Sequence, residues 1–331
     1  MLNPNQKLNS KIFDKDVEQT PIRNGFGEGL VLSAEKDERI VALCADLTES
    51  TKMLDFKNKF PNRFVEIGVA EQNLASVASG MAAMGKVPVI SSYAMFSPGR
   101  NWEQIRTTIC YNNRKVIIAG SHAGVSVGPD GGTHQAIEDI AITRVIPNMT
   151  VISPCDAIEA KKATQAILKD DIKTPVYLRL AREKTPIITT SDTPFIVGKA
   201  QIFFESVKPK VAIIATGALV HKALAVASEL EKKDVGSIVV NLATIKPFDV
   251  QTIVEVAHRA GAVVTVEEHQ IAGGMGSAVA ECLAQNYIVP IEFVGVKNLF
   301  GQSGTPEQLL EHYEMTEKFI EKAVIKVISR K

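Results

Sequence analysis

The feature that most constrains the fold is a series of short, uninterrupted apolar runs that alternate with stretches of helical periodicity. The runs lie at 39–47, 63–70, 86–94, 115–121, 149–156 and 174–181, and again at 210–217, 236–242, 262–269 and 291–296. An uninterrupted apolar run is typical of a strand that is buried on both faces, as in a parallel sheet covered by helices. The sequence therefore predicts two consecutive α/β domains, each a parallel sheet between two helical layers (a three-layer α/β/α arrangement).

A segment rich in proline, serine and threonine, "KTPIITTSDTPF" at 184–195, separates the two series. Such composition is typical of a connection between domains, and 331 residues suffice for two domains of ordinary size. We predict an N-terminal arm at 1–21, a first domain at 22–185, a linker at 186–195 and a second domain at 196–331.

Composition argues against several classes of protein. The 37 basic and 37 acidic residues balance, so the chain lacks the excess positive charge of a nucleic-acid binder. The N-terminus is polar, and no apolar run approaches the ~20 residues of a membrane helix. The four cysteines are far apart and form no CxxC pair, so we expect buried thiols and a cytoplasmic protein without nucleic-acid or membrane partners.

The stretch "SHAGVSVGPDGGTHQ" at 121–135 combines glycines, two histidines and an aspartate. His122 and His134 lie 12 residues apart with no cysteine nearby, which argues against a zinc site. Glycines in this loop would let the backbone approach a ligand closely, with the imidazoles presented to it. From residue types alone, solvated or helix-capping histidines are an equally good interpretation.

Three other motifs have simple structural explanations. Glu71 in "VAEQNLA" stands where a strand gives way to a helix, and a carboxylate there commonly compensates the helix dipole. The glycine clusters "RNGFGEGL" and "AGGMGSAV" lack the strand–turn–helix context and spacing of a dinucleotide-binding loop. Close helix packing or a tight turn is the better interpretation of both.

Five motifs occur in an order that resembles transketolase. They are "DLTES" at 46–50, "GVAEQN" at 68–73, "SSYAMFSPGRNWEQIR" at 91–106, "SHAGVSVGPDGGTHQAIEDIAITRVIPN" at 121–148 and "LRLAR" at 178–182. The resemblance covers the pyrimidine-binding and C-terminal domains of that family, from about Ile22 to the end. The GxxxGxDGxTHQ pattern is shared with deoxyxylulose-phosphate synthases, whereas "SHAG" and "IEDIA" favour transketolase.

The resemblance implies a thiamine diphosphate cofactor and a partner chain. In transketolases a separate N-terminal domain with a GDG…N signature holds the diphosphate and Mg²⁺ (or Ca²⁺). This sequence contains no GDG, so it resembles the C-terminal subunit of a split transketolase and implies no metal ligand in this chain. We expect an α2β2 heterotetramer with a homodimeric contact of this chain.

The resemblance also assigns residues to the cofactor. Glu71 matches the glutamate that hydrogen-bonds N1′ of the aminopyrimidine ring and is expected to be catalytic. Tyr93 and Phe96 match aromatic residues that stack on that ring, and Asp46 matches a carboxylate near the cofactor. A third aromatic position of many relatives is Gly99 here.

Further residues match those that contact sugar phosphates. His134 matches a catalytic histidine that contacts substrate oxygens and assists proton transfer, and Asp130 matches a carboxylate that reads the donor's hydroxyl stereochemistry. A phosphate pocket is expected from four residues: Arg23, Ser50, His122 and Arg182. We expect Arg179, on the same strand as Arg182, to share its face and assist.

The implied reaction is transfer of a two-carbon ketol unit from a ketose phosphate, such as xylulose 5-phosphate, to an aldose phosphate, such as ribose 5-phosphate. In the second domain, Glu267, Glu268 and His269 are assigned to packing and subunit contacts. Four alternatives remain: a split enzyme for another sugar, a deoxyxylulose-phosphate-synthase-like half, a 2-oxoacid dehydrogenase β subunit, and a non-catalytic subunit.

Overall fold

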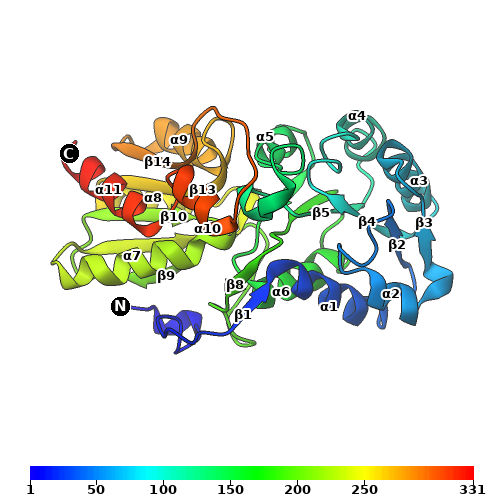
Figure 1. Ribbon diagram of the computed structural model, residues 1–331, viewed down its shortest axis with the longest axis horizontal. Coiled ribbons are helices and arrows are strands. Elements are labelled where there is room, and N and C mark those ends of the chain that lie inside the picture. The colour runs from blue at the N-terminus through cyan, green and yellow to red at the C-terminus, as the bar shows by residue number, and fades with distance from the viewer.

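The computed structural model describes residues 1–331 as two α/β units that lie side by side (Figure 1). The first sheet has seven strands in the spatial order β12-β6-β7-β5-β4-β2-β3, and the second has five in the order β14-β13-β10-β11-β9. Neighbouring strands are parallel except at one edge of each sheet, where β12 and β9 run antiparallel to β6 and β11. The expected layered α/β architecture is confirmed, with these two antiparallel edges as departures from it.

The strands are β1 (Gln19–Pro21), β2 (Ile40–Cys44), β3 (Phe64–Glu66), β4 (Val87–Tyr93), β5 (Ile117–Ser121), β6 (Thr150–Ile152), β7 (Val176–Arg179), β8 (Lys184–Pro186), β9 (Gln201–Glu205), β10 (Val211–Ala215), β11 (Ser237–Asn241), β12 (Thr244–Lys246), β13 (Val263–Gln270) and β14 (Ile291–Val296). The helices are α1 (Ile22–Ala34), α2 (Leu54–Lys59), α3 (Glu71–Ala83), α4 (Trp102–Gln104), α5 (Asp139–Arg144), α6 (Ala157–Leu168), α7 (Val220–Lys232), α8 (Val250–Ala260), α9 (Met275–Asn286), α10 (Pro306–His312) and α11 (Glu317–Ile328). A π-helical turn, Ile105–Cys110, continues α4.

Helices cover both faces of each sheet. In the first unit α1, α2 and α6 share one apolar core, and α3 and α5 share another. In the second unit α7 and α11 cover one face, while α8 and α9 cover the other. The core under α3 and α5 is continuous with the core under α8 and α9, so the two units bury apolar surface against each other.

The ten predicted apolar runs all contain strands, because each run supplies side chains for both faces of a covered sheet. The sequence did not predict β1, β8, β9 or β12. Strand β12 comes from the second half of the chain but pairs with β6 of the first sheet, with Thr244 opposite Ile152. Pairing with a distant strand leaves no local periodicity to read.

The N-terminal arm and the predicted linker are both hydrogen-bonded to the rest of the protein. The Asn3 N–H donates to the Phe203 carbonyl at 2.9 Å, so the start of the chain lies beside β9, below α7 in the view of Figure 1. In the predicted linker, the Ile188 and Thr189 N–H groups donate to the Asp156 carboxylate at 2.8 and 2.6 Å. The segment 184–195 therefore packs against the first unit and is not a free tether.

Glycines in α1 allow close packing against α6, as expected. A Cβ on Gly25 would lie 1.8 Å from the Ala157 carbonyl oxygen, and one on Gly29 would lie 2.8 Å from that of Lys161. All four cysteines are buried and free. None of the helices combines the length and apolarity needed to cross a membrane.

Candidate functional site

The residues predicted to form a site lie at one edge of the seven-stranded sheet, on segments that follow the carboxyl ends of its strands. Asp46 and Ser50 follow β2, Glu71 follows β3, Tyr93 and Phe96 end or follow β4, His122, Asp130 and His134 follow β5, and Arg182 follows β7. Arg23 reaches this edge from the first turn of α1. In α/β sheets, ligands bind outside the carboxyl ends of the strands, so the topology brings these side chains to the expected place.

Four rings pack together at this edge. Tyr93 and His122 stack with centroids 3.8 Å apart and planes 24° from parallel. Phe96 lies 6.2 Å from Tyr93 and nearly parallel to it, and it meets His134 edge-on at 5.4 Å. Tyr93, Phe96 and His134 are only half-buried, so this cluster leaves aromatic surface for a flat ligand beside two imidazoles.

His122 is held as a neutral ring of defined tautomer. Arg23 Nη1 lies 2.7 Å from His122 Nε2, and a guanidinium can only donate. Nε2 is therefore the acceptor, and the proton on Nδ1 donates to Ser121 Oγ at 2.8 Å. Burial, with Arg23 and Arg182 nearby, lowers the pKa of His122 to about 3, so this imidazole is neutral at physiological pH.

The guanidinium groups of Arg23 and Arg182 lie near His122 and together form a site that favours an anion, the anion corner. Burial and the charge of Arg182 lower the pKa of Arg23, and Arg23 Nε is buried without a hydrogen-bond partner. Arg182 Nη1 donates to the Val127 carbonyl at 2.5 Å and lies 3.6 Å from Asp130 Oδ1. A phosphate or sulfonate oxygen near Arg23 would satisfy the free N–H and reduce the repulsion between the two cations.

Glu71 begins α3 and is 3% exposed. Arg100 Nη1 donates to its Oε2 at 3.0 Å, and Asn101 Nδ2 donates to its backbone carbonyl at 2.9 Å. The guanidinium of Arg100 also lies 4.9 Å from the centroid of the Phe96 ring. Sequence reasoning missed Arg100 and Asn101 because nothing in their local pattern links them to a glutamate 29 and 30 residues earlier, respectively.

Asp46 and Ser50 lie at the same edge but outside this network. Asp46 is exposed, has a left-handed backbone (φ 56°), and its N–H donates to Glu66 Oε1 at 2.8 Å. Thr48 Oγ1 donates to the other oxygen of Glu66 at 3.0 Å. No hydrogen bond or ion pair joins Asp46 or Ser50 to the rings or the two arginines.

The expectation for Arg179 is wrong. Its side chain is buried, with Nε donating to Asp139 Oδ2 at 2.7 Å and Nη2 donating to the Glu268 carbonyl at 2.8 Å. Arg179 and Arg182 are three positions apart, and an odd separation places side chains on opposite faces of an extended chain. Arg179 therefore joins the two halves of the molecule and does not reach the anion corner.

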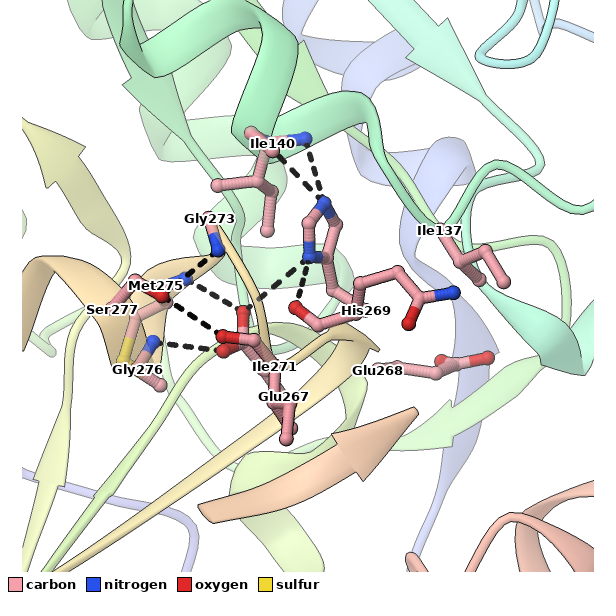
Figure 2. Close-up of polar contacts among 12 residues, drawn as sticks. Ile137, Ile140, Glu267, Glu268, His269, Ile271, Gly273, Met275, Gly276 and Ser277 are labelled. Atoms are coloured by element: carbon pink, nitrogen blue, oxygen red, sulfur yellow. Dashed lines mark hydrogen bonds and ion pairs between the residues drawn. The ribbon is translucent and has the colours of Figure 1, made fainter. Parts of the chain in front are cut away.

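The end of β13 lies between the two halves (Figure 2). The Glu267 carboxylate accepts the N–H groups of Met275 and Gly276 at 2.6 and 2.8 Å, and His269 Nε2 accepts that of Ile140 at 3.2 Å. Burial raises the pKa of Glu267 to about 7 and lowers that of His269 to about 4. Glu267, Glu268 and His269 are all buried, which agrees with the packing role expected for them; a contact with another subunit stays a prediction.

Two family models match the chain. The transketolase pyrimidine-binding domain matches residues 18–187, and the transketolase C-terminal domain matches residues 198–320. No group of three or more His, Cys, Asp or Glu residues is arranged to hold a metal ion.

Similar proteins share this two-domain extent. The 6-deoxy-6-sulfo-D-fructose transketolase subunit SqwH of Clostridium sp. is 39% identical over 96% of this chain and 98% of its own length. An apulose-4-phosphate transketolase subunit of Phocaeicola vulgatus is 32% identical over 93% of this chain and 97% of its own. A solved structure described as a split gene transketolase, inactive beta4 tetramer, superposes with a TM-score of 0.86 at 42% identity, covering 93% of this chain and 98% of that one. The chain thus belongs to the transketolase family, and it corresponds along nearly its whole length to the C-terminal subunits of split transketolases.

Proposed function

We propose that this chain, with a partner chain carrying the diphosphate-binding domain, transfers a two-carbon ketol unit from a ketose phosphate to an aldose phosphate. Xylulose 5-phosphate and ribose 5-phosphate are the proposed donor and acceptor. The supporting observation is that a buried carboxylate, half-buried aromatic faces, two imidazoles and two guanidinium groups meet at one strand edge.

The residues at one side of this edge fit the aminopyrimidine half of thiamine diphosphate. Tyr93 and Phe96 offer half-buried faces for a flat ring, and the Glu71 carboxyl group can share a proton with a ring nitrogen. When bound, the cofactor supplies the electron sink for breaking and forming the C–C bond. Arg100 donates to Oε2 of Glu71, so Oε1 is left for the ring nitrogen.

The other side of the edge fits the sugar phosphate. Arg23 and Arg182 would hold the phosphate, and this anchor far from the reacting carbon turns binding energy into positioning. His122, neutral and fixed by Arg23 and Ser121, would orient substrate oxygens. His134 would move the proton of a substrate hydroxyl, and Asp130 would accept from a hydroxyl of one configuration. Asp46 and Ser50 would join only when ligands are bound.

The partner is proposed to hold the diphosphate and the Mg²⁺ or Ca²⁺ ion. The site residues of this chain supply the groups for a pyrimidine ring and a sugar phosphate. The similar β4 tetramer is described as inactive, which supports the need for a second type of subunit. We propose two copies of each chain, with this chain also contacting its own copy.

The identity of the sugar is tested directly. Relatives are named for 6-deoxy-6-sulfo-D-fructose and for apulose 4-phosphate, and the guanidinium pair would accept a sulfonate as readily as a phosphate. The test is ketol transfer to ribose 5-phosphate from xylulose 5-phosphate and, in a parallel assay, from 6-deoxy-6-sulfo-D-fructose, the sugar named for a relative. Each assay uses this chain alone and mixed with a GDG-bearing partner, with thiamine diphosphate and Mg²⁺. Activity with xylulose 5-phosphate only in the mixture would support the proposal. Activity only with the sulfonated donor would retain ketol transfer but replace the proposed donor. Absence of thiamine diphosphate binding in the mixture would contradict the proposal.

A further inference from the structure

The loop from Gly124 to Gln135 carries Asp130 and His134, yet much of what holds it comes from the second half of the chain. We propose that the C-terminal domain positions this loop for catalysis, and that Gln135 and Glu268 are positioning residues. The inference rests on the proposed function for the roles of Asp130 and His134, but its structural part stands on contacts within this chain.

Glu268, at the end of β13, fixes the start of the loop. Its Oε1 accepts the Ser126 N–H at 2.5 Å, and the side chain is 3% exposed. Gly124 has a left-handed backbone (φ 92°), and a Cβ there would lie 2.4 Å from the same oxygen. The Gly124 N–H donates to the Ala136 carbonyl at 2.8 Å, so the loop closes on itself directly over this carboxylate.

Gln135 joins the loop to the second domain. Its Nε2 lies 3.0 Å from the Val125 carbonyl, 3.0 Å from that of Gln302 and 3.4 Å from that of Gly128. Three carbonyl groups around one end of the amide settle its orientation, because only the nitrogen can donate to them. The side chain is 1% exposed and its Oε1 has no hydrogen-bond partner. This oxygen lies against the backbone of Gly301.

The glycine segment, defined here as residues 301–304 between β14 and α10, leaves no spare space against Gln135. A Cβ on Gly301 would lie 1.8 Å from Gln135 Oε1. A Cβ on Gly132 would in turn lie 2.5 Å from the Gly301 carbonyl oxygen. Backbone therefore touches backbone between the two domains, and the fit depends on the absence of side chains at these positions.

The glycine segment also bears on the residues that flank Asp130. Ser303 Oγ donates to the Pro129 carbonyl at 3.1 Å, and a Cβ on Gly131 would lie 2.7 Å from Ser303 Oγ. The residues on both sides of Asp130 thus contact one serine of the second domain. His134 follows closely, because its N–H donates to the Gly131 carbonyl at 3.0 Å.

These contacts predict an effect on substrate handling and not on cofactor binding. Glu71 begins α3, Tyr93 ends β4 and Phe96 follows it, and none of the three is among the nearest neighbours of Gly301 or Gly304. Displacing catalytic groups by about 1 Å can lower a rate by about a hundredfold. A disturbed glycine segment should therefore lower kcat/KM for the ketose donor and leave the Kd for thiamine diphosphate unchanged.

Gly301→Ala, assayed in the complex with the partner chain, is the direct test. The added methyl group must displace Gln135, and we expect kcat/KM for the donor to fall by about tenfold to a hundredfold. The matched control is Gly80→Ala in α3, where a Cβ would meet no atom within 4 Å; it should behave as the unmodified chain. Equal kcat/KM in the two variants would overturn the inference.

A second measurement identifies Gln135 as the intermediary. If the methyl group acts by displacing Gln135, then Gly301→Ala introduced into a Gln135→Ala chain should change kcat/KM by less than about twofold, since contacting residues are not additive. Multiplicative losses in the double variant would assign the effect of Gly301→Ala elsewhere and contradict the proposed route. Ser303→Ala, which removes one hydrogen bond and adds no bulk, gives a milder version should Gly301→Ala fold poorly.

Hydrogen exchange separates this inference from the proposed function. In the full chain without partner or substrate, amides of residues 124–135 should exchange faster in Gly301→Ala or Ser303→Ala than in Gly80→Ala. If exchange is faster but the chain forms no active complex, the positioning role is supported and ketol transfer is refuted. Unchanged exchange in both variants would refute the positioning role even in an active enzyme.

Discussion

Both sheets carry polar side chains at the carboxyl ends of their strands, but the two edges differ in how exposed these side chains are. The first sheet ends in half-buried Tyr93 and His134 and exposed Asp46, all open to a ligand. The corresponding edge of the second sheet carries Asn241 at the end of β11 and the Glu267–His269 run in β13, and every one of these side chains is at most 3% exposed. The first half of the chain covers the second edge, whereas the first edge keeps half-buried and exposed side chains.

The difference shows that the position of polar groups in a fold does not decide their role. At the covered edge, carboxylates meet partners from the other half: Glu268 binds the Ser126 N–H, and Asn241 Nδ2 donates to Glu159 at 2.7 Å. At the open edge, Arg23 keeps a buried N–H without a partner. Polar contacts at the covered edge thus join the two halves, whereas the unpartnered N–H of Arg23 lies beside the half-buried rings of the open edge.

The largest expected effect lies at the open edge. Glu71→Gln removes the carboxyl proton donor without removing the shape, and we expect turnover with the partner chain to fall by about 10² to 10⁴. Gln72→Ala, at the exposed neighbouring position, is the control and should keep its activity. Steady-state rates of Glu71→Gln within a factor of a few of the unmodified complex would refute the catalytic assignment.

The covered edge should instead control stability. Burial alone would raise the pKa of Asp139, but Arg179 and Tyr177 hold it below the ordinary value. Asp139→Ala leaves the Arg179 charge buried without its partner, which should lower the free energy of unfolding by about 3–5 kcal/mol. Urea unfolding should show a loss well under about 1 kcal/mol for Arg39→Ala, whose ion pairs are exposed. Similar losses in both variants would contradict a special role for the buried pair.

A smaller effect is expected at the anion corner. Arg182→Ala removes one of two guanidinium groups, and a charge-assisted hydrogen bond contributes about 1.5–3 kcal/mol. We expect KM for the phosphorylated donor to rise by about tenfold to a hundredfold while the Kd for thiamine diphosphate is unchanged. Arg114→Ala, an exposed arginine without an ion pair, is the control. A change in the Kd for thiamine diphosphate without a change in KM for the donor would indicate that Arg182 contacts the cofactor and would contradict its assignment to the sugar phosphate.

The smallest effect is a difference in the pH dependence of stability. His122 has a pKa of about 3 in the folded chain against an ordinary 6.5; the unfolded chain binds the extra proton between these values, so stability rises with pH in that window. Glu267 has a pKa of about 7 against an ordinary 4.5; the folded chain binds the extra proton there, so stability falls as pH rises.

Single substitutions should remove each contribution. Between pH 4.5 and 6.5, urea unfolding of His122→Asn should show a less positive slope of stability against pH, and that of Glu267→Gln a more positive one. His258→Asn, an exposed histidine, serves as the control for the first. If the slope of stability against pH changes in the same direction in His122→Asn and Glu267→Gln, the opposite pH dependence assigned to the two edges is contradicted.

Most of the layered fold could be predicted because local pattern and tertiary environment agree. The run at 115–121 contains β5, and the Asp156 side chain caps α6 by accepting the Glu159 N–H at 2.7 Å. The antiparallel edge strand β12 could not be predicted, since its partner lies about ninety residues earlier in the chain. Arg179 was assigned to the wrong side because its separation from Arg182 is odd and its partners come from α5 and β13.

The sequence by itself determined the family, the two sheets and the segments that carry the candidate site, because strand patterning and the spacing of motifs are local properties. Only the tertiary structure showed that Arg100 binds Glu71, that Arg23 fixes the tautomer of His122, and that Gln135 faces Gly301. Each of these contacts joins residues far apart in the chain. Their chemistry depends on burial and on which donor meets which acceptor, and neither is set before the chain folds.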